Sequence, residues 1–199
     1  EKTEQQVISA LVKKGSKWEK VTVPTINVAD AKTTKANGYK PAIPADTETV
    51  ENGKVYTAQF ITNGQEITPG TKLPDGVFEV SVSRDETSVK DNALYGKSYA
   101  VFKDSKLAQD KFPTPQAEDN FKDAKWNVEG NPWDQAITKN TDFKASATSS
   151  TFDKQNITKI EVIQDPTTMT YTEGDKPKHD GIKVKLTDKN GNTVEVEKD

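Results

Sequence analysis

Two stretches of this chain share one pattern: SALVKKGSKWEKVTVPT at Ser9–Thr25 and SYAVFKDSKLAQDKFPT at Ser98–Thr114. They align without a gap at a shift of 89 residues, and seven of the seventeen aligned positions are identical. The identities are Ser9/Ser98, Val12/Val101, Lys14/Lys103, Ser16/Ser105, Lys17/Lys106, Pro24/Pro113 and Thr25/Thr114. Self-similarity at a fixed shift predicts a module that occurs twice.

The likeness continues downstream at a slightly different shift. YTAQF at Tyr56–Phe60 corresponds to FKASA at Phe143–Ala147, and a single gap of two residues joins the two registers. Between these anchors, each copy runs from Pro-Thr through a polar middle to an aromatic residue, Tyr39 in the first copy and Trp126 in the second. The repeat therefore extends over a whole small module.

The composition predicts thin cores. The hydrophobic fraction of the 199 residues is 32% and the mean hydropathy is -0.83, yet three Trp, five Tyr and seven Phe are spread along the chain. Several small domains account for both facts better than one large core. The chain has no cysteine, which excludes disulfides and thiolate metal sites. No run approaches the 18 apolar residues of a membrane span, so we expect no membrane insertion.

The charges indicate a solvated surface of mixed sign. Lysine and acidic residues are interspersed, the net charge is -3, and Arg84 is the only arginine. A nucleic-acid face would need clustered basic charge with arginine for bidentate contacts. We therefore expect no nucleic-acid partner.

The local patterns are mostly those of strands. Strands are predicted at Val55–Ile61, Val77–Ser83, Lys97–Lys103 and Ile157–Ile163, and a hairpin turning at Asn190-Gly191 is predicted near the C-terminal end. Asp85–Tyr95 is predicted as a short helix that begins at Asp85 or Thr87 and ends before Gly96. Glu4–Lys14 has helical character too, but the alignment with SYAVF favours a strand in its second half.

Three modules follow from these observations. Residues 1–62 are the first copy, and whether it lacks an N-terminal strand stays open. Residues 63–150 contain the second copy, and the polar joint Thr148–Thr151 precedes a third module at residues 151–199. The chain starts and stops in mid-pattern, which predicts a piece of a longer protein.

The repeated copies resemble the internalin B-type repeat, also called the Listeria–Bacteroides repeat. The residues that carry the resemblance are VKKGSKW, VPT, GYKP and VYTAQF in the first copy, and Val101, Lys106-Leu107, Pro113-Thr114, Trp126 and Ile137–Phe143 in the second. Asp104 stands where the family has the glycine that the first copy keeps as Gly15. The resemblance implies small β-grasp-like modules, in tandem and elongated, on a bacterial surface protein.

The C-terminal module is similar to bacterial immunoglobulin-like domains of surface proteins. The matching residues are Tyr171, Gly174, Asp175, Gly181, Val184 and the turn at Asn190-Gly191. An immunoglobulin sandwich needs about seven strands in ~100 residues, so this module is either reduced or cut short. The fold class expected for the chain is therefore mainly β, with two β-grasp-like repeats and one immunoglobulin-like module.

Patterns that could carry catalysis or metal binding have simpler explanations. His179 beside Asp180 could be half of a catalytic pair, but an exposed loop histidine explains it better, because the sequence organises no further partner. Asp188–Asp199 carries oxygen side chains at calcium-like spacing, but an EF-hand needs Gly where Thr193 stands, and the flanks alternate as strands. Paired acids could hydrolyse glycosides, although no pair lies in an apolar setting. We expect no catalytic residue, no metal ligand and no cofactor.

The tryptophans are the remaining candidates for a binding surface. Trp18 and Trp126 are predicted to anchor small cores, because small β modules need large buried side chains. Trp133 has no counterpart in the first copy and is the predicted binding residue. Surface adhesins of Gram-positive bacteria often carry Lys–Asn isopeptide crosslinks, which need a buried Lys, Asn and acid in contact; the sequence leaves their presence open.

The function expected from the repeats and the resemblance is non-enzymatic. The chain would be a repeat region of an extracellular protein at a bacterial cell surface or cell wall, acting as an adhesin or as the stalk that displays one. The expected partner is a host extracellular protein or glycan, and the chain would be a monomeric rod within a longer protein. The alternatives are a pure spacer and an accessory region of a large secreted protease or glycosidase.

Overall fold

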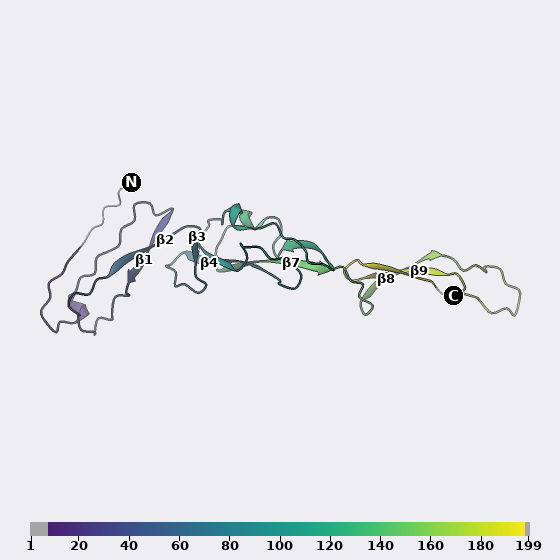
Figure 1. Cartoon of the computed structure of the whole chain (residues 1–199), viewed down its shortest axis with the longest axis horizontal. Helices are drawn as coiled ribbons and strands as arrows, with labels where there is room; N and C mark the ends of the chain where they lie inside the picture. The colour runs from purple at the N-terminus through teal and green to yellow at the C-terminus, as the bar shows by residue number, and fades with distance from the viewer. Residues whose placement is uncertain (1–7, 198–199) are drawn as a thin grey trace. The chain divides into compact units, whose positions relative to one another are not determined.

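The computed structural model describes residues 8–197 and shows a mainly β chain (Figure 1). In this part of the chain the helical elements are three short 3-10 turns: η1 (Trp18–Lys20), η2 (Gln109–Lys111) and η3 (Pro132–Asp134). The strands are β1 (Thr34–Lys40), β2 (Thr57–Thr62), β3 (Gln65–Ile67), β4 (Val77–Arg84), β5 (Lys97–Phe102), β6 (Phe121–Trp126), β7 (Thr141–Ser149), β8 (Ile157–Gln164), β9 (Lys183–Asp188) and β10 (Thr193–Glu197).

These strands form three sheets. The first is the hairpin β1-β2, the second has the order β3-β5-β4-β7-β6, and the third has the order β10-β9-β8. The chain divides into two compact units: residues 1–81, 97–111 and 133–142, and residues 82–96, 112–132 and 143–199. Strands β4 and β7 of the second sheet contribute residues to both units.

The first unit has a small core that joins β2 to the start of the second sheet. Ile61, Val77, Ala100 and Phe102 are buried together. The N–H of Phe102 donates to the side-chain oxygen of Asn63 at 2.8 Å, which anchors the turn after β2. Burial of these apolar side chains supplies the main stabilisation at this point of the chain.

The second unit contains an aromatic cluster. The ring centroid of Phe112 lies 5.5 Å from that of Trp126 and 5.4 Å from that of Phe143. Both pairs are edge to face, which is a favoured geometry for aromatic rings. Tyr95 lies 5.9 Å from Trp126. Trp18 in the first unit and Trp126 here are both buried, which confirms that these tryptophans anchor cores.

The two repeated modules carry backbone hydrogen bonds at equivalent positions. The pairs are Ser16 N–H to Lys13 C=O (3.0 Å) with Ser105 N–H to Phe102 C=O (2.9 Å), Val50 N–H to Ser16 C=O (2.9 Å) with Ile137 N–H to Ser105 C=O (2.8 Å), and Asn63 N–H to Thr33 C=O (2.9 Å) with Ser150 N–H to Asn120 C=O (2.7 Å). The first pair follows the shift of 89 residues. The last pair follows the shift of 87, and the middle pair connects the two registers. We call residues 9–62 the first copy and residues 98–149 the second copy.

The hairpins of the two copies have the same register. Tyr39 lies opposite Ala58 in β1-β2, and Trp126 lies opposite Ala145 in β6-β7, 87 residues later on both strands. Each hairpin also contains one register irregularity, at which two residues of the first strand lie between successive pairs opposite one residue of the second strand. The aromatic anchors of the two copies therefore occupy equivalent positions.

The mismatch between Gly15 and Asp104 is conformationally conservative. Gly15 has φ 85° and Asp104 has φ 62°, so both residues are left-handed. Glycine adopts this region without steric cost, and aspartate tolerates it better than most other residues. The turn after the first segment is thus kept in both copies.

The predicted helix at Asp85–Tyr95 is wrong. The side chain of Asp85 accepts the N–H of Thr87 at 3.0 Å, which closes a single turn. After this turn, Val89 pairs with Ala117 in an isolated antiparallel β-bridge, and its side chain is completely buried. Long-range pairing of this kind outweighs a weak helical propensity.

The predicted strand in the second half of Glu4–Lys14 is also wrong. Residues 8–13 form no strand and are exposed, whereas their counterparts in β5 are almost all buried in the second sheet. Residues 4–7 of this prediction lie outside the described residues. The predicted strands at Val77–Ser83, Lys97–Lys103 and Ile157–Ile163 and the C-terminal hairpin are confirmed, within one residue at most ends. β7 continues to Ser149, into the joint predicted at Thr148–Thr151.

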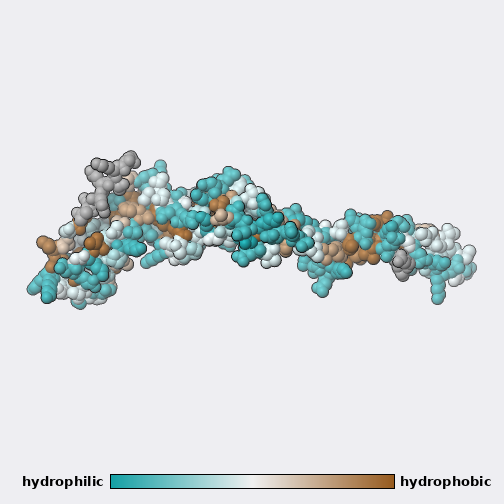
Figure 2. Space-filling model, viewed as in Figure 1, coloured by the Kyte–Doolittle hydropathy of each residue, from teal (hydrophilic) through white to brown (hydrophobic). Residues whose placement is uncertain are grey.

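The third sheet is amphipathic. Ile160, Leu186 and Val194 lie side by side across its three strands, as do Val162, Val184 and Val196. The residues between these rows are mostly lysine and glutamate. Figure 2 shows apolar surface over β8 and β9, in agreement with the partial exposure of these rows.

Candidate functional site

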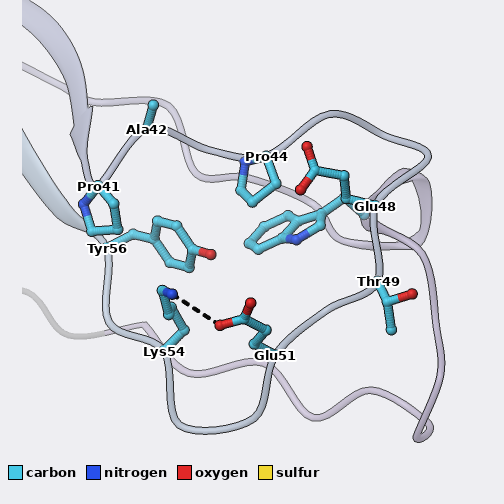
Figure 3. Close-up of a pocket in the computed structure, with 9 residues that line it drawn as sticks. Pro41, Ala42, Pro44, Glu48, Thr49, Glu51, Lys54 and Tyr56 are labelled. Carbon is cyan, nitrogen blue, oxygen red and sulfur yellow. Dashed lines mark hydrogen bonds and ion pairs between the residues drawn. The ribbon is translucent and has the colours of Figure 1, made fainter.

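A hollow lies in the first copy, between η1 and the loop that joins β1 to β2. It has a volume of about 180 Å³. Its lining residues are Trp18, Pro41, Ala42, Pro44, Glu48, Thr49, Glu51, Lys54 and Tyr56. Figure 3 shows the ring of Tyr56 between Pro41 and the Lys54–Glu51 pair.

Backbone contacts position the tryptophan at this hollow. The N–H of Trp18 donates to the C=O of Glu48 at 3.0 Å, and Lys17 forms a bridge with Thr49. The ring of Trp18 meets Tyr56 edge to face at 5.2 Å. The loop between β1 and β2 is therefore tied to the segment around η1, although the two are about thirty residues apart in the sequence.

The indole N–H of Trp18 is buried and has no hydrogen-bond partner among residues 8–197. A buried polar group without a partner costs about 1–3 kcal/mol. The burial of the Trp18 ring and its contact with Tyr56 offset this cost.

The charged groups at the hollow include an ion pair. The ammonium of Lys54 lies 2.9 Å from a carboxylate oxygen of Glu51. The hydrogen bond to Glu51, together with the charge of that carboxylate, raises the pKa of Lys54, so this lysine stays protonated. A cationic lysine is not a nucleophile. The remaining polar side-chain groups here are two carboxylates, the hydroxyls of Thr49 and Tyr56, and the indole N–H of Trp18. The arrangement can stack an apolar or sugar ring against Tyr56 and the prolines and hydrogen-bond its polar edge.

The residues singled out in the sequence lie elsewhere. Trp133 is half-buried in η3 and does not line the hollow. His179 is exposed in the loop between β8 and β9, as expected of a loop histidine. Among residues 8–197, no group of three or more His, Asp or Glu side chains is placed to hold a metal ion. The role of Trp133 as a binding residue stays a prediction.

A second polar cluster, which the sequence did not reveal, joins β6 to the turn of the third sheet. The ammonium of Lys122 donates to the side-chain oxygen of Asn192 at 2.6 Å. The amide nitrogen of Asn192 donates to the carbonyls of Ser149 and Thr151 and to the carboxylate of Asp188. A lysine, an asparagine and an acid are therefore in one chain of contacts, with Asn192 and Asp188 both buried.

Asp188 is the anchor of that cluster. Its carboxylate accepts the backbone N–H groups of Asp153, Asn190 and Asn192 at 2.8–2.9 Å. Burial acts to raise the pKa of Asp188, but these donors and the Asn192 amide together lower it below the ordinary value of 3.8. The oxygen-rich spacing that suggested calcium thus serves the hairpin turn.

Sequence signals for these two sites were weak. The hollow depends on a loop of sixteen residues, 41–56, that contains no strand. Its position in the module is nevertheless readable from the repeat, because Trp18 and Tyr56 correspond to Leu107 and Phe143, which are fully buried in the second copy. The contact between Lys122 and Asn192 spans 70 residues and leaves no local pattern.

Comparisons with known proteins give no relative for this chain. No family model, no curated protein and no solved structure matches it. Within residues 8–197, no helix combines the length and apolar character required to cross a membrane.

Proposed function

We propose that this chain is a non-enzymatic repeat region of a bacterial cell-surface or secreted protein, acting as an adhesin or as the stalk that displays one. The observation that carries the proposal is the repeated module, with its recurring hydrogen bonds and equivalent hairpin registers. Repeated small modules extend reach and multiply display surface. The resemblance to internalin B-type repeats and immunoglobulin-like surface domains gives the setting.

The contact surface of this function is the hollow of the first copy. The ring of Tyr56 and two prolines provide an apolar floor, and Glu48 and Thr49 add polar groups. A host extracellular protein or a glycan would fit this hollow, because both present apolar faces edged by hydrogen-bonding groups. Trp133 is a second proposed contact residue.

The proposal is tested by binding of the whole chain to immobilised matrix proteins and a glycan array. We expect saturable binding to at least one ligand. Replacement of Lys54 by Gln should weaken that binding at least about tenfold, because a charged hydrogen bond contributes about 1.5–3 kcal/mol. The matched control is Lys159→Gln, which removes an exposed lysine that is paired with Glu161 in the third sheet.

The tryptophan prediction has its own variant. Trp133→Ala should weaken binding if Trp133 contacts the ligand, and circular dichroism shows whether the fold is kept. Binding that is equal in the parent chain and in both Lys54→Gln and Trp133→Ala would remove these contacts from the proposal. Absence of saturable binding across both panels would contradict the adhesin and leave a stalk without its own ligand.

A further inference from the structure

Asparagine is followed directly by glycine at four places in this chain. The pairs are Asn37-Gly38, Asn52-Gly53, Asn63-Gly64 and Asn190-Gly191, and each glycine is left-handed, with φ between 73° and 79°. An asparagine before glycine loses its side-chain amide readily, because glycine has no Cβ to hinder attack by its own backbone nitrogen. The four pairs therefore share one chemistry and one glycine conformation, and they differ in what surrounds them.

Hydrogen bonds hold the pair Asn63-Gly64 in place. The N–H of Gly64 donates to the C=O of Ala100 at 2.7 Å, and the side-chain oxygen of Asn63 accepts the N–H of Phe102 at 2.8 Å. The attacking nitrogen and the group that it would attack are thus both bound to β5. Neither can approach the other unless this turn opens.

Two further pairs are held by their hairpins. The N–H of Gly191 donates to the C=O of Asp188 at 3.1 Å, and the N–H of Asn190 donates to the carboxylate of Asp188 at 2.8 Å. Asn37 and Gly38 lie inside β1, at the register irregularity of the β1-β2 hairpin, with paired residues on both sides. Rotation of the backbone at either pair therefore disturbs a hairpin.

The pair Asn52-Gly53 lacks restraints of this kind. It forms a turn in the loop 41–56, and it is the one pair of the four in which both residues are exposed. Among residues 8–197, neither the N–H of Gly53 nor the side chain of Asn52 has a hydrogen-bond partner. The turn is spanned by the ion pair of Glu51 and Lys54, and an ion pair between exposed side chains contributes little stability.

We propose that Asn52 is a modification site, at which the side-chain amide is lost through a cyclic imide formed with Gly53. The backbone nitrogen of Gly53 attacks Cγ of Asn52, and an N–Cγ bond forms. The Cγ–Nδ2 bond breaks, and the amide group leaves as ammonia with the proton that the peptide nitrogen gives up. Water then opens the imide: attack at Cγ gives aspartate, and attack at the backbone carbonyl carbon gives isoaspartate.

The free energy of local opening sets the order of the four sites. Ring closure needs the backbone of the asparagine to rotate until the glycine nitrogen reaches Cγ. A hydrogen-bonded turn permits this rotation only after it has opened locally. The turn at Asn52 breaks no described backbone hydrogen bond when it rotates, so its asparagine reacts first.

Either product adds a carboxylate to the turn that holds the Lys54–Glu51 pair. The new negative charge directly follows Glu51 in the sequence and gives Lys54 a second anionic group in the same turn. The modification therefore changes the charge beside the hollow of the first copy. It needs no ligand, so it stands whether or not the hollow binds one.

The test is peptide mapping by mass spectrometry while the folded whole chain is incubated in neutral buffer. Cleavage after lysine places the four pairs in separate peptides, and each is scored for the mass gained when an amide becomes a carboxylate. We expect conversion at Asn52 to be at least about tenfold faster than at Asn63, and faster than at Asn37 and Asn190. Conversion at any of these three sites as fast as at Asn52 overturns the proposal.

The unfolded chain is the reference for this measurement. In concentrated urea the four pairs should convert at similar rates, because glycine follows each asparagine. If Asn52 keeps the same lead in urea, the local sequence and not the fold sets the order, and the proposal is contradicted. An Asn52 that stays intact in the folded chain while it converts in urea contradicts it as well.

The variant Asn52→Gln assigns the modified residue. We expect the mass gain to disappear from the peptide that contains position 52, because the longer side chain closes an imide ring much more slowly. The peptides with Asn37, Asn63 and Asn190 serve as internal controls and should convert as in the parent chain. A mass gain that persists in the position-52 peptide at the parent rate contradicts the assignment.

Discussion

At the scale of single residues, the left-handed turn that both copies share is carried by different amino acids, Gly15 and Asp104. We expect Asp104→Ala to lower the free energy of unfolding by about 1 kcal/mol. Alanine has a Cβ that clashes with the following carbonyl at positive φ, and it has no polar side chain to offset the clash. Asp104→Gly should leave it unchanged or raise it slightly. Urea denaturation of both variants measures the difference, and equal destabilisation by Ala and Gly would show that the aspartate side chain, not its backbone, matters.

Asp188 makes the third sheet sensitive to acid. Its folded-state pKa is lowered, so its contribution to stability is present above the unfolded value of 3.8 and is lost as the pH falls through the folded pKa. We expect the loss in amide protection of β9 and β10 below this value to be much smaller in Asp188→Asn than in the parent chain. The measurement is hydrogen exchange against pH; identical acid profiles would contradict the role of this carboxylate.

We expect Lys122 and Asn192 to stay a hydrogen-bonded pair without an amide crosslink. A crosslink would join the lysine nitrogen to the Asn192 side-chain carbon with loss of ammonia, and it needs a protonated acid beside the amide. The N–H donors around Asp188 lower the pKa of its carboxyl, which disfavours the protonated form that the crosslinking step needs. We expect the intact mass to equal the value calculated from the sequence; a mass lower by one ammonia would contradict this prediction.

At the scale of elements, the equivalent anchors of the two hairpins differ in how much they bury. Trp126 is buried against Phe112 and Tyr95, whereas Tyr39 is half-buried and donates its hydroxyl to the C=O of Pro24 at 2.7 Å. We expect Trp126→Ala to cost about 3–5 kcal/mol of unfolding free energy. Tyr39→Ala should cost less than half as much. Thermal unfolding of both variants checks this order, and the reverse order would contradict the claim that burial sets the cost of losing each anchor.

Elements were predictable from the sequence where local alternation and long-range packing agree. Val77–Ser83 alternates and is a central strand, so its pattern and its burial coincide. The helix predicted at residues 85–95 and the strand predicted at residues 8–13 are absent because local pattern and long-range packing disagree there. In the first case a bridge to Ala117 overrides helical spacing, and in the second a segment with strand composition has no described neighbour to pair with. The hollow at Tyr56 has no local sequence signal of its own, because a loop without periodicity builds it, although the repeat places Trp18 and Tyr56 at equivalents of buried residues.

At the scale of the whole molecule, the chain is a set of small sheets in two compact units, with one module present twice. The repeat was readable from the sequence because its two registers are conserved to the residue. Its backbone hydrogen bonds follow the same gap of two residues. The function proposed for the chain rests on this repetition, since it favours display surface over a single reactive centre.

Amide hydrogen exchange at the equivalent positions Val50 and Ile137 tests the repeated module most directly. The N–H of each donates across the copy, to Ser16 and Ser105 respectively. We expect both amides to exchange much more slowly than their exposed neighbours, with Ile137 the slower because it is buried. Exchange of the Val50 amide at the rate of an unstructured chain, beside a protected Ile137, would contradict the claim that the two copies share one framework.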